Sequence, residues 1–369
     1  MLSIFQRKPK TCIGIDIGTS SIKVVQLKRS ENRYRLETYG ELQTYGYLER
    51  LNDPLQTKSL KILEAHVIEM VKELLKETGA TTKNAVMSIP VFSSFVSVTD
   101  LPPMLEKELQ RALVFEAKRH IPIPLSEVRI DWKIINKTIV DLGGGLSVGK
   151  TGKKGLTKFR VILIAVPKEV IAKYLRIAKA LELKLLALEL ESFSYIRSLV
   201  GSDPSTICIL DFGARSTSFT VVDKSFIQMS HSLDIAGSEL TKALAHGMGI
   251  DFRRAEAYKR ESGLGAGGLG AEKELRDILL TFVDKIVLEL ERMIDSYQRK
   301  TKRKVTKLIL SGGSGGLVGL EEHLKKRLEL NIEIANPWAR VVRLSLLDPI
   351  LKELAPKFAV AAGAAMREL

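Results

Sequence analysis

The stretch Gly14-Ile-Asp-Ile-Gly-Thr-Ser-Ser-Ile-Lys-Val-Val25 decides the fold, together with a near copy in the second half of the chain, Leu210-Asp-Phe-Gly-Ala-Arg-Ser-Thr-Ser-Phe-Thr-Val-Val222. Each predicts a β-hairpin: an apolar run ends in an acidic residue, glycine and small polar residues make a tight turn, and a run rich in β-branched residues leads away. Glycine at positions 18 and 213 would let backbone N–H groups approach phosphate oxygens, and the hydroxyls add donors. We expect each turn to suit a phosphate chain.

The acidic residues of the two hairpins, Asp16 and Asp211, would repel phosphate on their own. Their presence implies a hydrated Mg²⁺ between the carboxylates and a nucleotide. One such hairpin is equally well explained as an ordinary strand–turn–strand with a polar tip. Two of them, spaced by about one domain, favour a duplicated fold that clamps a nucleoside triphosphate between its halves, which is the plan of the actin-like ATPases.

Composition bounds the class of protein. The chain has 369 residues, of which 45% are hydrophobic and 27% charged, as expected for a soluble protein with two domains. No apolar run approaches the roughly 18 to 20 residues of a membrane-spanning helix, and the N-terminus lacks the order of a secretory signal. We therefore expect a cytoplasmic protein in which Cys12 and Cys208 are core thiols without a disulfide. The five histidines lack ligand spacing, so we expect no metal site beyond the Mg²⁺ of the nucleotide.

The net charge of +14 comes from basic clusters at Arg7–Lys10, Lys150–Lys158 and Arg299–Lys307. A basic surface can serve nucleic acid, anionic lipid or an acidic partner. Aromatic residues make up only 6% of the chain and do not alternate with these clusters, so no stacking platform for single-stranded nucleic acid is indicated. Attraction to a membrane surface, or solubility alone, is favoured over nucleic-acid binding.

The order of predicted elements indicates an α/β protein with two ribonuclease-H-like lobes. Strands are predicted at 34–42, 84–89, 130–140, 160–166, 206–210 and 307–310, and helices at 55–77, 105–120, 168–180, 237–241, 250–261, 271–299 and 320–328. The glycine-dense segment 263–270 is interpreted as a flexible surface connection. The small residues after Phe358 suit a closely packed C-terminal helix. The expected organisation is a first lobe at 1–91 and 167–204, a subdomain inserted at 92–166, a second lobe at 205–350, and a helix at 351–369 that packs on the first lobe.

A Walker A pattern also occurs, from Gly144 to Thr151. The pattern binds phosphate only where a strand precedes it and its Lys-Thr pair begins a helix. Here a second Gly/Lys-rich turn and a β-like run, Phe159–Val166, follow it. We interpret the segment as a hairpin turn and reject the P-loop.

A third candidate for the nucleotide site is Ser311-Gly-Gly-Ser314, between a predicted strand and helix, where glycines would let adenine and ribose lie against backbone. Glu256 and Lys259 share a helix face and could hold the ribose or base. A solvent-exposed ion pair explains the spacing of Glu256 and Lys259 equally well.

In this order the elements resemble the superfamily of actin, the heat-shock chaperones and FtsA, and within it the PilM family of type IV pilus assembly proteins. The resemblance covers nearly the whole chain and rests on Ile13–Gln26, Phe115–Pro124, Asp234–Lys242 and Phe358–Gly363. The Ile-Pro-Ile-Pro124 element in an FtsA-type insertion separates it from actin and the chaperones. The resemblance implies that ATP or ADP binds with Mg²⁺, that Lys23 contacts phosphate, and that Glu256 and Lys259 hold the nucleoside.

The nucleotide-binding residues expected from the motifs and the resemblance together lie in the two hairpins, the following helices and the glycine turn. They are Asp16, Gly18, Thr19, Ser20, Ser21, Lys23, Asp211, Gly213, Ala214, Arg215, Ser216, Thr217, Gly237, Glu256, Lys259, Gly312, Gly313, Ser314 and Gly316, with Asp16 and Asp211 acting on Mg²⁺ through water. Hydrolysis in the superfamily needs a polar residue near the γ-phosphate, for which Glu191 or Glu189 is the candidate. We therefore expect at most a slow ATPase, in which bound nucleotide sets lobe closure.

The resemblance further implies a scaffold in the inner-membrane platform for twitching motility, which binds the N-terminal tail of a PilN-like single-pass membrane protein. Other platform proteins, motor ATPases and further copies of the chain are possible partners. The alternative is an FtsA-like filament protein of cell division, which would need a terminal membrane helix, whereas this chain stops at Leu369 in its last expected helix. A sugar or acid kinase would need a catalytic Asp base in a substrate pocket.

The inserted segment is the expected place for the PilN-like tail. An apolar helix face with Leu105, Leu109 and Leu113, beside extended strands, could form a groove for an extended peptide between the insertion and the first lobe. Alternatively, these residues only pack the core of the subdomain.

Overall fold

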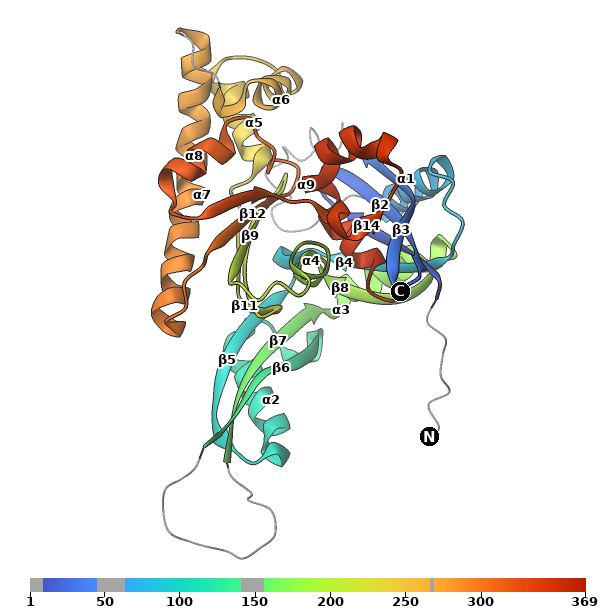
Figure 1. Ribbon diagram of the computed structural model, residues 1–369, viewed down its shortest axis with the longest axis vertical. Helices are drawn as coiled ribbons and strands as arrows, with labels where there is room; N and C mark the ends of the chain where they lie inside the picture. Colours follow the sequence, from blue (N-terminus) through green and yellow to red (C-terminus); the bar gives the residue numbers. More distant parts are fainter. Residues whose placement is uncertain (1–8, 45–63, 141–155, 266–268) are drawn as a thin grey trace, which may run out of the picture.

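The computed structural model describes residues 9–44, 64–140, 156–265 and 269–369, and contains three β-sheets (Figure 1). A six-stranded sheet has the order β14-β3-β2-β1-β4-β8, a five-stranded sheet the order β11-β10-β9-β12-β13, and a three-stranded sheet the order β5-β7-β6. The six-stranded sheet belongs to the first lobe and the five-stranded sheet to the second. The three-stranded sheet belongs to the insertion, which projects from the two lobes at the bottom of Figure 1.

The first lobe covers its sheet on both faces, because its central strands are buried on both sides. Helices α1 and α3 pack on one face around Ile13 and Ile15, while α9 packs on the other around Cys12 and Val25. The elements of this lobe are β1 (Thr11–Ile17), β2 (Ser21–Ser30), β3 (Arg33–Gln43), α1 (Glu64–Glu77), β4 (Asn84–Ile89), α3 (Lys168–Ala180), β8 (Lys184–Leu190), α4 (Glu191–Tyr195), the π-helical turn η5 (Ile196–Val200), η7 (Pro337–Arg340), β14 (Val341–Val342), η8 (Ser345–Leu347) and α9 (Asp348–Ala365).

The second lobe packs its helices around the long helix α7, whose apolar face is buried against the sheet through Leu279, Val283 and Leu290. Its elements are β9 (Ile207–Phe212), β10 (Thr217–Asp223), β11 (Phe226–Leu233), α5 (Gly237–Gly247), α6 (Phe252–Glu261), η6 (Gly263–Gly265), α7 (Ala271–Thr301), β12 (Lys307–Ser311), α8 (Leu320–Arg327) and β13 (Asn331–Ile334). Cys208 is buried in this core and Cys12 in the first lobe; both are free thiols, and burial raises the pKa of each to about 12.

The insertion has a core of its own. Leu109 and Leu113 are buried against its sheet, so these two residues of the expected docking face pack the subdomain instead. The helix expected from Leu105 begins at Leu109, after one 3-10 turn. The elements are η2 (Val91–Ser93), β5 (Phe95–Met104), η3 (Glu106–Glu108), α2 (Leu109–His120), η4 (Leu125–Glu127), β6 (Val128–Val140) and β7 (Leu156–Pro167).

Helix α9 lies unusually close to the first sheet, as its small residues predict. A Cβ placed on Gly14 of β1 would lie 1.9 Å from the carbonyl oxygen of Ala361, and one on Gly363 would lie 2.0 Å from that of Ser194. No side chain fits at either position without moving backbone. This contact brings the C-terminal helix against the strand that leads into the first hairpin.

Three features differ from the sequence prediction or lie beyond it. Val341–Val342 already pairs with β3, so the chain returns to the first sheet before the expected boundary at residue 350. In the glycine-dense segment, expected to be a flexible surface connection, Gly263 and Leu264 are buried, and the Leu264 N–H donates to the Val318 carbonyl (2.7 Å).

The Walker A match and residues 55–63 of the first predicted helix lie outside the described residues. No helix within the described ranges is long and apolar enough to span a membrane.

Candidate functional site

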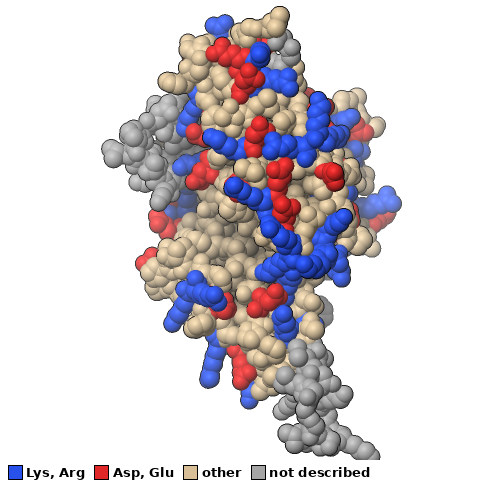
Figure 2. All heavy atoms as spheres, turned by 90° about the vertical axis from the view of Figure 1, so that its left-hand side faces the viewer, with Lys and Arg blue, Asp and Glu red and all other residues tan. Residues whose placement is uncertain are grey.

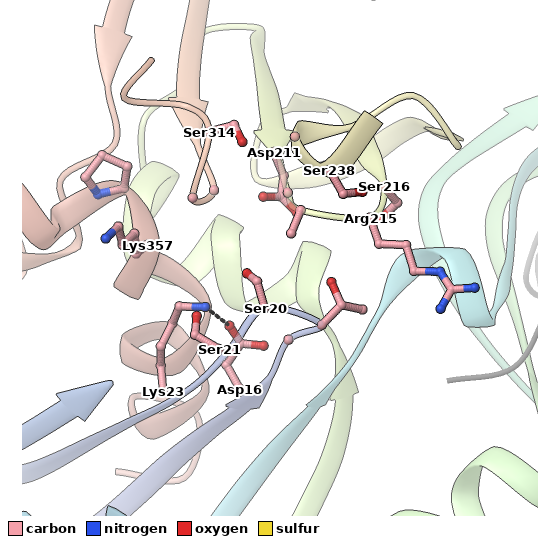
Figure 3. A pocket seen from close by; sticks show the side chains of 18 of the residues that line it. Asp16, Ser20, Ser21, Lys23, Asp211, Arg215, Ser216, Ser238, Ser314 and Lys357 are labelled. Carbon is pink, nitrogen blue, oxygen red and sulfur yellow. Dashed lines mark ion pairs between the residues drawn. The ribbon is translucent and has the colours of Figure 1, made fainter. Parts of the chain in front are cut away.

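A cleft of about 320 Å³ opens between the two lobes, at the ends of the strands that carry the paired motifs. Its volume lies in the range of about 300 to 1,000 Å³ that is usual for small-ligand and cofactor sites. Figure 3 shows side chains from the first hairpin, the second hairpin, the glycine turn after β12 and helix α9 around one space. Segments far apart in the sequence therefore meet in this cleft.

The turns of the two hairpins have the same geometry. The N–H of Gly18 donates to the carbonyl of Ser21 at 3.1 Å, and the N–H of Gly213 donates to that of Ser216 at the same distance. A Cβ on Gly18 would lie 2.9 Å from the Ser21 oxygen, and one on Gly213 would lie 2.7 Å from the Ser216 oxygen. Glycine is therefore required at both positions, because a side chain would collide with the carbonyl oxygen to which the turn hydrogen bond is made.

Three carboxyl groups of the cleft, those of Asp16, Asp211 and Glu191, have the Lys23 ammonium as the neighbouring positive charge. Asp16 is buried, lies 3.8 Å from the Lys23 ammonium and accepts a hydrogen bond from Ser88 (3.2 Å). Burial raises the pKa of Asp16 despite the opposing charge of Lys23, and burial raises the pKa of partly buried Asp211 to about 6. The pKa of Glu191 is raised well above its ordinary value by burial, and further by Asp16 and Asp211. The three carboxyl groups therefore oppose one another's ionisation.

This imbalance fits a divalent cation. Buried charges in proteins are normally paired or coordinate a metal, and hard oxygen ligands suit Mg²⁺. No group of three or more His, Cys, Asp or Glu side chains in the described part of the chain is arranged to hold a metal by itself. The carboxylates of Asp16 and Asp211 fit a hydrated Mg²⁺ that takes its remaining ligands from phosphate oxygens.

The glycine turn after β12 forms a flat wall of the cleft. Gly312 has φ of +85°, and a Cβ there would lie 2.5 Å from the Asp211 Oδ1, so the turn passes directly over the second hairpin. The Ser314 N–H donates to the Phe212 carbonyl at 2.8 Å and fixes this position. A Cβ on Gly313 or Gly316 would meet open space. The wall therefore offers bare backbone to a planar group.

Glu256 and Lys259 are not a solvent-exposed ion pair, which rules out the simpler explanation of their spacing. Lys259 is only 5% exposed, and its ammonium donates to Glu256 (2.7 Å), the Thr241 hydroxyl (2.8 Å) and the Gly237 carbonyl (2.9 Å). Burial favours the neutral form of Glu256, but Lys259, Thr241 and Arg260 together outweigh it and hold the pKa of Glu256 below its ordinary value. The pair is a rigid polar corner of the cleft.

The cleft brings together all of the predicted site residues except Thr217. Those that line it are Asp16, Gly18, Thr19, Ser20, Ser21, Lys23, Glu191, Asp211, Gly213, Ala214, Arg215, Ser216, Gly237, Glu256, Lys259, Gly312, Gly313, Ser314 and Gly316. The side chain of Arg215 points away from Asp211 (Figure 3). Thr217 is fully buried, and its hydroxyl donates to the Ile235 carbonyl at 2.6 Å. The side chain of Thr217 therefore does not line the cleft, because the pairing of β10 with β9 and β11 turns it into the lobe.

Of the two candidate glutamates, Glu191 lines the cleft and Glu189 does not. Glu191 begins α4, lines the cleft, and accepts a hydrogen bond from the Val91 N–H at 3.2 Å. Glu189 lies outside the cleft lining, where Arg197 (2.7 Å) and Arg367 (3.1 Å) neutralise it. Glu189 joins α4 to the end of the chain and has no free carboxylate for chemistry in the cleft.

Helix α9 contributes cleft residues that sequence reasoning missed. Glu353, Pro356, Lys357 and Val360 all line the space, and Lys357 lies beside the cleft opposite Arg215 in Figure 3. The Lys357 ammonium is 3.7 Å from Glu41 of β3, another missed residue. The small-residue pattern of α9 indicates close packing, but it carries no signal for a ligand. Further missed lining residues are Gln43, Phe92, Tyr195, Ser238, Phe252 and Arg260.

The family model of the type IV pilus assembly protein PilM matches residues 14–369. The chain belongs to the PilM family. That match spans both hairpins, the insertion, the glycine turn and α9, so all residues that line the cleft lie within the matched part of the chain.

Solved structures and a curated relative agree on the fold. A structure of a PilM–PilN type IV pilus biogenesis complex is similar with a TM-score of 0.79 and 24% identity, over 98% of this chain and 99% of that one. MreB 5 of Spiroplasma citri bound to AMPPNP has a TM-score of 0.50 and 11% identity, over 96% and 95% of the two chains. The cell division protein FtsA of Staphylococcus epidermidis is 20% identical over 90% of this chain and 75% of its own length. This PilM-family chain therefore has the actin-like ATPase fold.

Proposed function

We propose that the chain is a cytoplasmic ATP-binding scaffold of the type IV pilus inner-membrane assembly platform. The convergence of both hairpins and the glycine turn on one cleft carries the nucleotide part of this proposal. The AMPPNP bound to the similarly folded MreB 5 supports it. Membership of the PilM family supports the role in pilus assembly.

Each wall of the cleft has a part in nucleotide binding under this proposal. The backbone of the two turns and the Lys23 ammonium hold the phosphates, with Asp16 and Asp211 ordering the water around Mg²⁺. The Glu256–Lys259 corner holds the ribose or base against the bare backbone of Gly313. ATP or ADP then contacts both lobes at once, so its binding favours one relative position of the lobes.

Turnover of ATP is expected to be slow. Glu191 is the side chain placed to position a water, but burial and its acidic neighbours favour its protonated form, which is a poor base. The nucleotide then serves as a structural ligand that binds only the folded state and stabilises it.

Isothermal titration with Mg-ATP tests the cleft. We expect Asp16→Ala and Asp211→Ala each to weaken binding strongly, because each removes a carboxylate that organises Mg²⁺. Lys150→Ala, in the rejected Walker A match, is the control and should bind normally. Loss of binding in Lys150→Ala alone would contradict the assignment, as would a melting temperature unchanged by millimolar Mg-ATP, since a hundredfold excess over Kd should add about 2.7 kcal/mol.

The partner in this proposal is the N-terminal cytoplasmic tail of a PilN-like single-pass inner-membrane protein. A groove of about 470 Å³ lies between the insertion and the first lobe, where such a tail is expected, and Ser225, Phe226 and Ile227 of the second lobe complete its lining. The similarity to a PilM–PilN complex supports this choice of partner. Binding of the tail would hold the scaffold on the inner membrane.

The groove has the character of a peptide site. Its lining includes apolar side chains from three parts of the molecule, among them Ile135, Phe193 and Ile227, with Arg33 and Lys133 exposed nearby. Ile135 and Lys133 belong to β6, an edge strand of the three-stranded sheet. An exposed sheet edge beside apolar pockets suits an extended peptide, which can add a strand and insert alternate side chains.

Fluorescence anisotropy with a labelled synthetic tail tests the groove. Ile135→Asp should weaken binding at least about tenfold, because a carboxylate replaces an apolar contact of the peptide. Leu346→Asp, at an exposed apolar residue outside the groove lining, is the matched control. Both variants should still bind Mg-ATP. Equal tail affinity in the two variants would place the partner elsewhere.

A further inference from the structure

The C-terminal end of α7 carries the strongest basic run among the described residues. Every residue from Arg299 to Lys304 except Thr301 is lysine or arginine, and all of these cations are exposed. Figure 2 shows Lys and Arg side chains gathered at mid-height on the face of the molecule that this helix borders. Nothing in the nucleotide cleft uses them.

This helix end is firmly attached to the turn between β10 and β11. Arg303 forms an ion pair with Asp223 at 2.8 Å, and the Tyr297 hydroxyl donates to the same carboxylate at 3.1 Å. Asp223 is buried at the end of β10, so the contact fixes α7 against the strand. The next residue, Lys224, is exposed and has φ of +51° in the tight turn. Lys224 therefore joins the cations of α7 on one rigid surface.

Most of this charge is not used for folding. Within the described residues, no carboxylate pairs with Lys224, Lys300, Lys302 or Lys304, whereas Arg303 is paired. Cations in the last turn stabilise a helix through its dipole, but that effect is confined to the turn itself. Lys302 is the C-cap residue of α7, Lys304 lies two residues beyond it, and Lys224 belongs to another element. A helix-capping role leaves Lys304 and Lys224 unexplained.

The basic surface is next to the groove proposed for the membrane protein's tail. Ser225 and Phe226, which directly follow Lys224, line that groove, and the Lys133 ammonium lies 5.4 Å above the Phe226 ring. A tail held there belongs to a protein that continues into the bilayer. The surface formed by Lys224, Arg299, Lys300, Lys302 and Lys304 would then lie within reach of the membrane.

We propose that this basic surface rests on anionic phospholipid headgroups while the tail of the membrane partner occupies the groove. The orientation rests on the proposed function, but the attraction to lipid is a property of this chain alone. Long, exposed cations suit the non-directional field of an anionic leaflet, which attracts each lysine or arginine near its surface. No aromatic residue of the run could stack on bases, which disfavours single-stranded nucleic acid.

Co-sedimentation of the full chain with vesicles tests the proposal without any partner. Binding is expected to vesicles of phosphatidylcholine mixed with phosphatidylglycerol, and not to phosphatidylcholine alone. The triple variant Lys224→Gln, Lys300→Gln, Lys304→Gln should bind at least about tenfold more weakly, because three attracted charges are lost. Its matched control removes three exposed lysines of α1 and α3, Lys72→Gln, Lys76→Gln and Lys179→Gln, which lie on the other lobe.

Further measurements separate the effect of charge on lipid binding from other effects of the substitutions. The same three positions changed to arginine should keep wild-type lipid binding, and raising the salt concentration should weaken it. Equal lipid binding by the two glutamine triple variants would overturn the proposal. Tighter binding to a short DNA duplex than to anionic vesicles, lost in the first variant only, would overturn it in favour of nucleic acid. The affinity for the synthetic tail, measured separately, should be unchanged in the first variant. If the chain did not bind the tail at all, that result would contradict the proposed function and would leave the lipid proposal standing.

Discussion

The two hairpins have the same turn but place their cation differently. Both turns close through a hydrogen bond of 3.1 Å from glycine to the fourth residue of the turn. In the first hairpin, Asp16 pairs across the strands with Lys23, whereas in the second, Asp211 pairs with Ser218. The two copies therefore share a turn geometry, but only the first places a cation, Lys23, opposite its acid, whereas the cation of the second, Arg215, lies in the turn and points away from Asp211. The comparison teaches that backbone N–H groups are common to the two halves, and that only the first half sets a positive charge against its own carboxylate.

The strands that lead into the hairpins differ as well. Two residues before the acid, the first hairpin has Gly14, which lies against the backbone of α9, and the second has Ile209, which packs in the core between the lobes. Helix α9 thus covers the first hairpin strand closely and contributes Lys357 to the cleft. Each difference between the copies can be tested by changing equivalent positions.

The largest effect is expected at Gly14. Gly14→Val would place side-chain atoms inside the Ala361 carbonyl, and backbone cannot move away as a flexible side chain would, so we expect a loss of about 3 kcal/mol or more, or no folded protein. Ile209→Val, at the equivalent position, should cost about 0.5 to 1.5 kcal/mol. Urea unfolding followed by circular dichroism measures both. A Gly14→Val variant as stable as Ile209→Val would show that α9 does not pack this closely.

The next largest effect is expected on nucleotide affinity. Lys23→Met removes the only cation that the hairpins place opposite an acid, so Mg-ATP should bind roughly 10- to 100-fold more weakly. Ser218→Ala, at the equivalent position, should lose no more than about tenfold. Titration calorimetry decides between them. If Ser218→Ala were the more damaging change, the cation would not distinguish the two copies.

The pH dependence of stability should report on the second hairpin. Burial raises the pKa of Asp211 to about 6 from its ordinary value of 3.8, so the folded chain holds the proton more tightly than the unfolded chain. Ionisation of Asp211 then costs stability, and its contribution to the free energy of unfolding should fall by up to roughly 3 kcal/mol as the pH rises from about 4 to about 6. The raised pKa values of Asp16 and Glu191 add to this fall.

The variant Asp211→Asn should show a smaller fall than the wild type, and Asp295→Asn, at an exposed residue, should show the full fall. Chemical unfolding of the nucleotide-free proteins across this pH range is the measurement. An identical pH profile for wild type and Asp211→Asn would mean that the carboxyl group is not held in a charge-poor environment.

The smallest effect is expected at Thr217. Its hydroxyl donates to the Ile235 carbonyl and does not line the cleft, so Thr217→Val should leave Mg-ATP affinity within about twofold while lowering stability by about 1 to 2 kcal/mol. Thr19→Val, in the turn of the first hairpin, should weaken Mg-ATP binding and leave stability nearly unchanged, because Thr19 lines the cleft. Parallel titration and thermal unfolding of the two variants check this exchange of roles.

The sequence by itself determined the two hairpins, the α/β order and the glycine turn, because each depends on local rules. Glycine is needed where a turn is tight, β-branched runs form strands, and helices repeat every 3.6 residues. The actin-like fold followed from the pairing of these motifs, and the family match confirmed it. Only the tertiary structure decided which side chains face the cleft. Glu189 and Glu191 are two residues apart, yet Arg197 and Arg367 neutralise the first, while the second faces the ligand space. Lys357 enters the cleft because α9 docks against Gly14; the small residues of α9 predict the close packing, but no local pattern records which residues of the helix face the cleft.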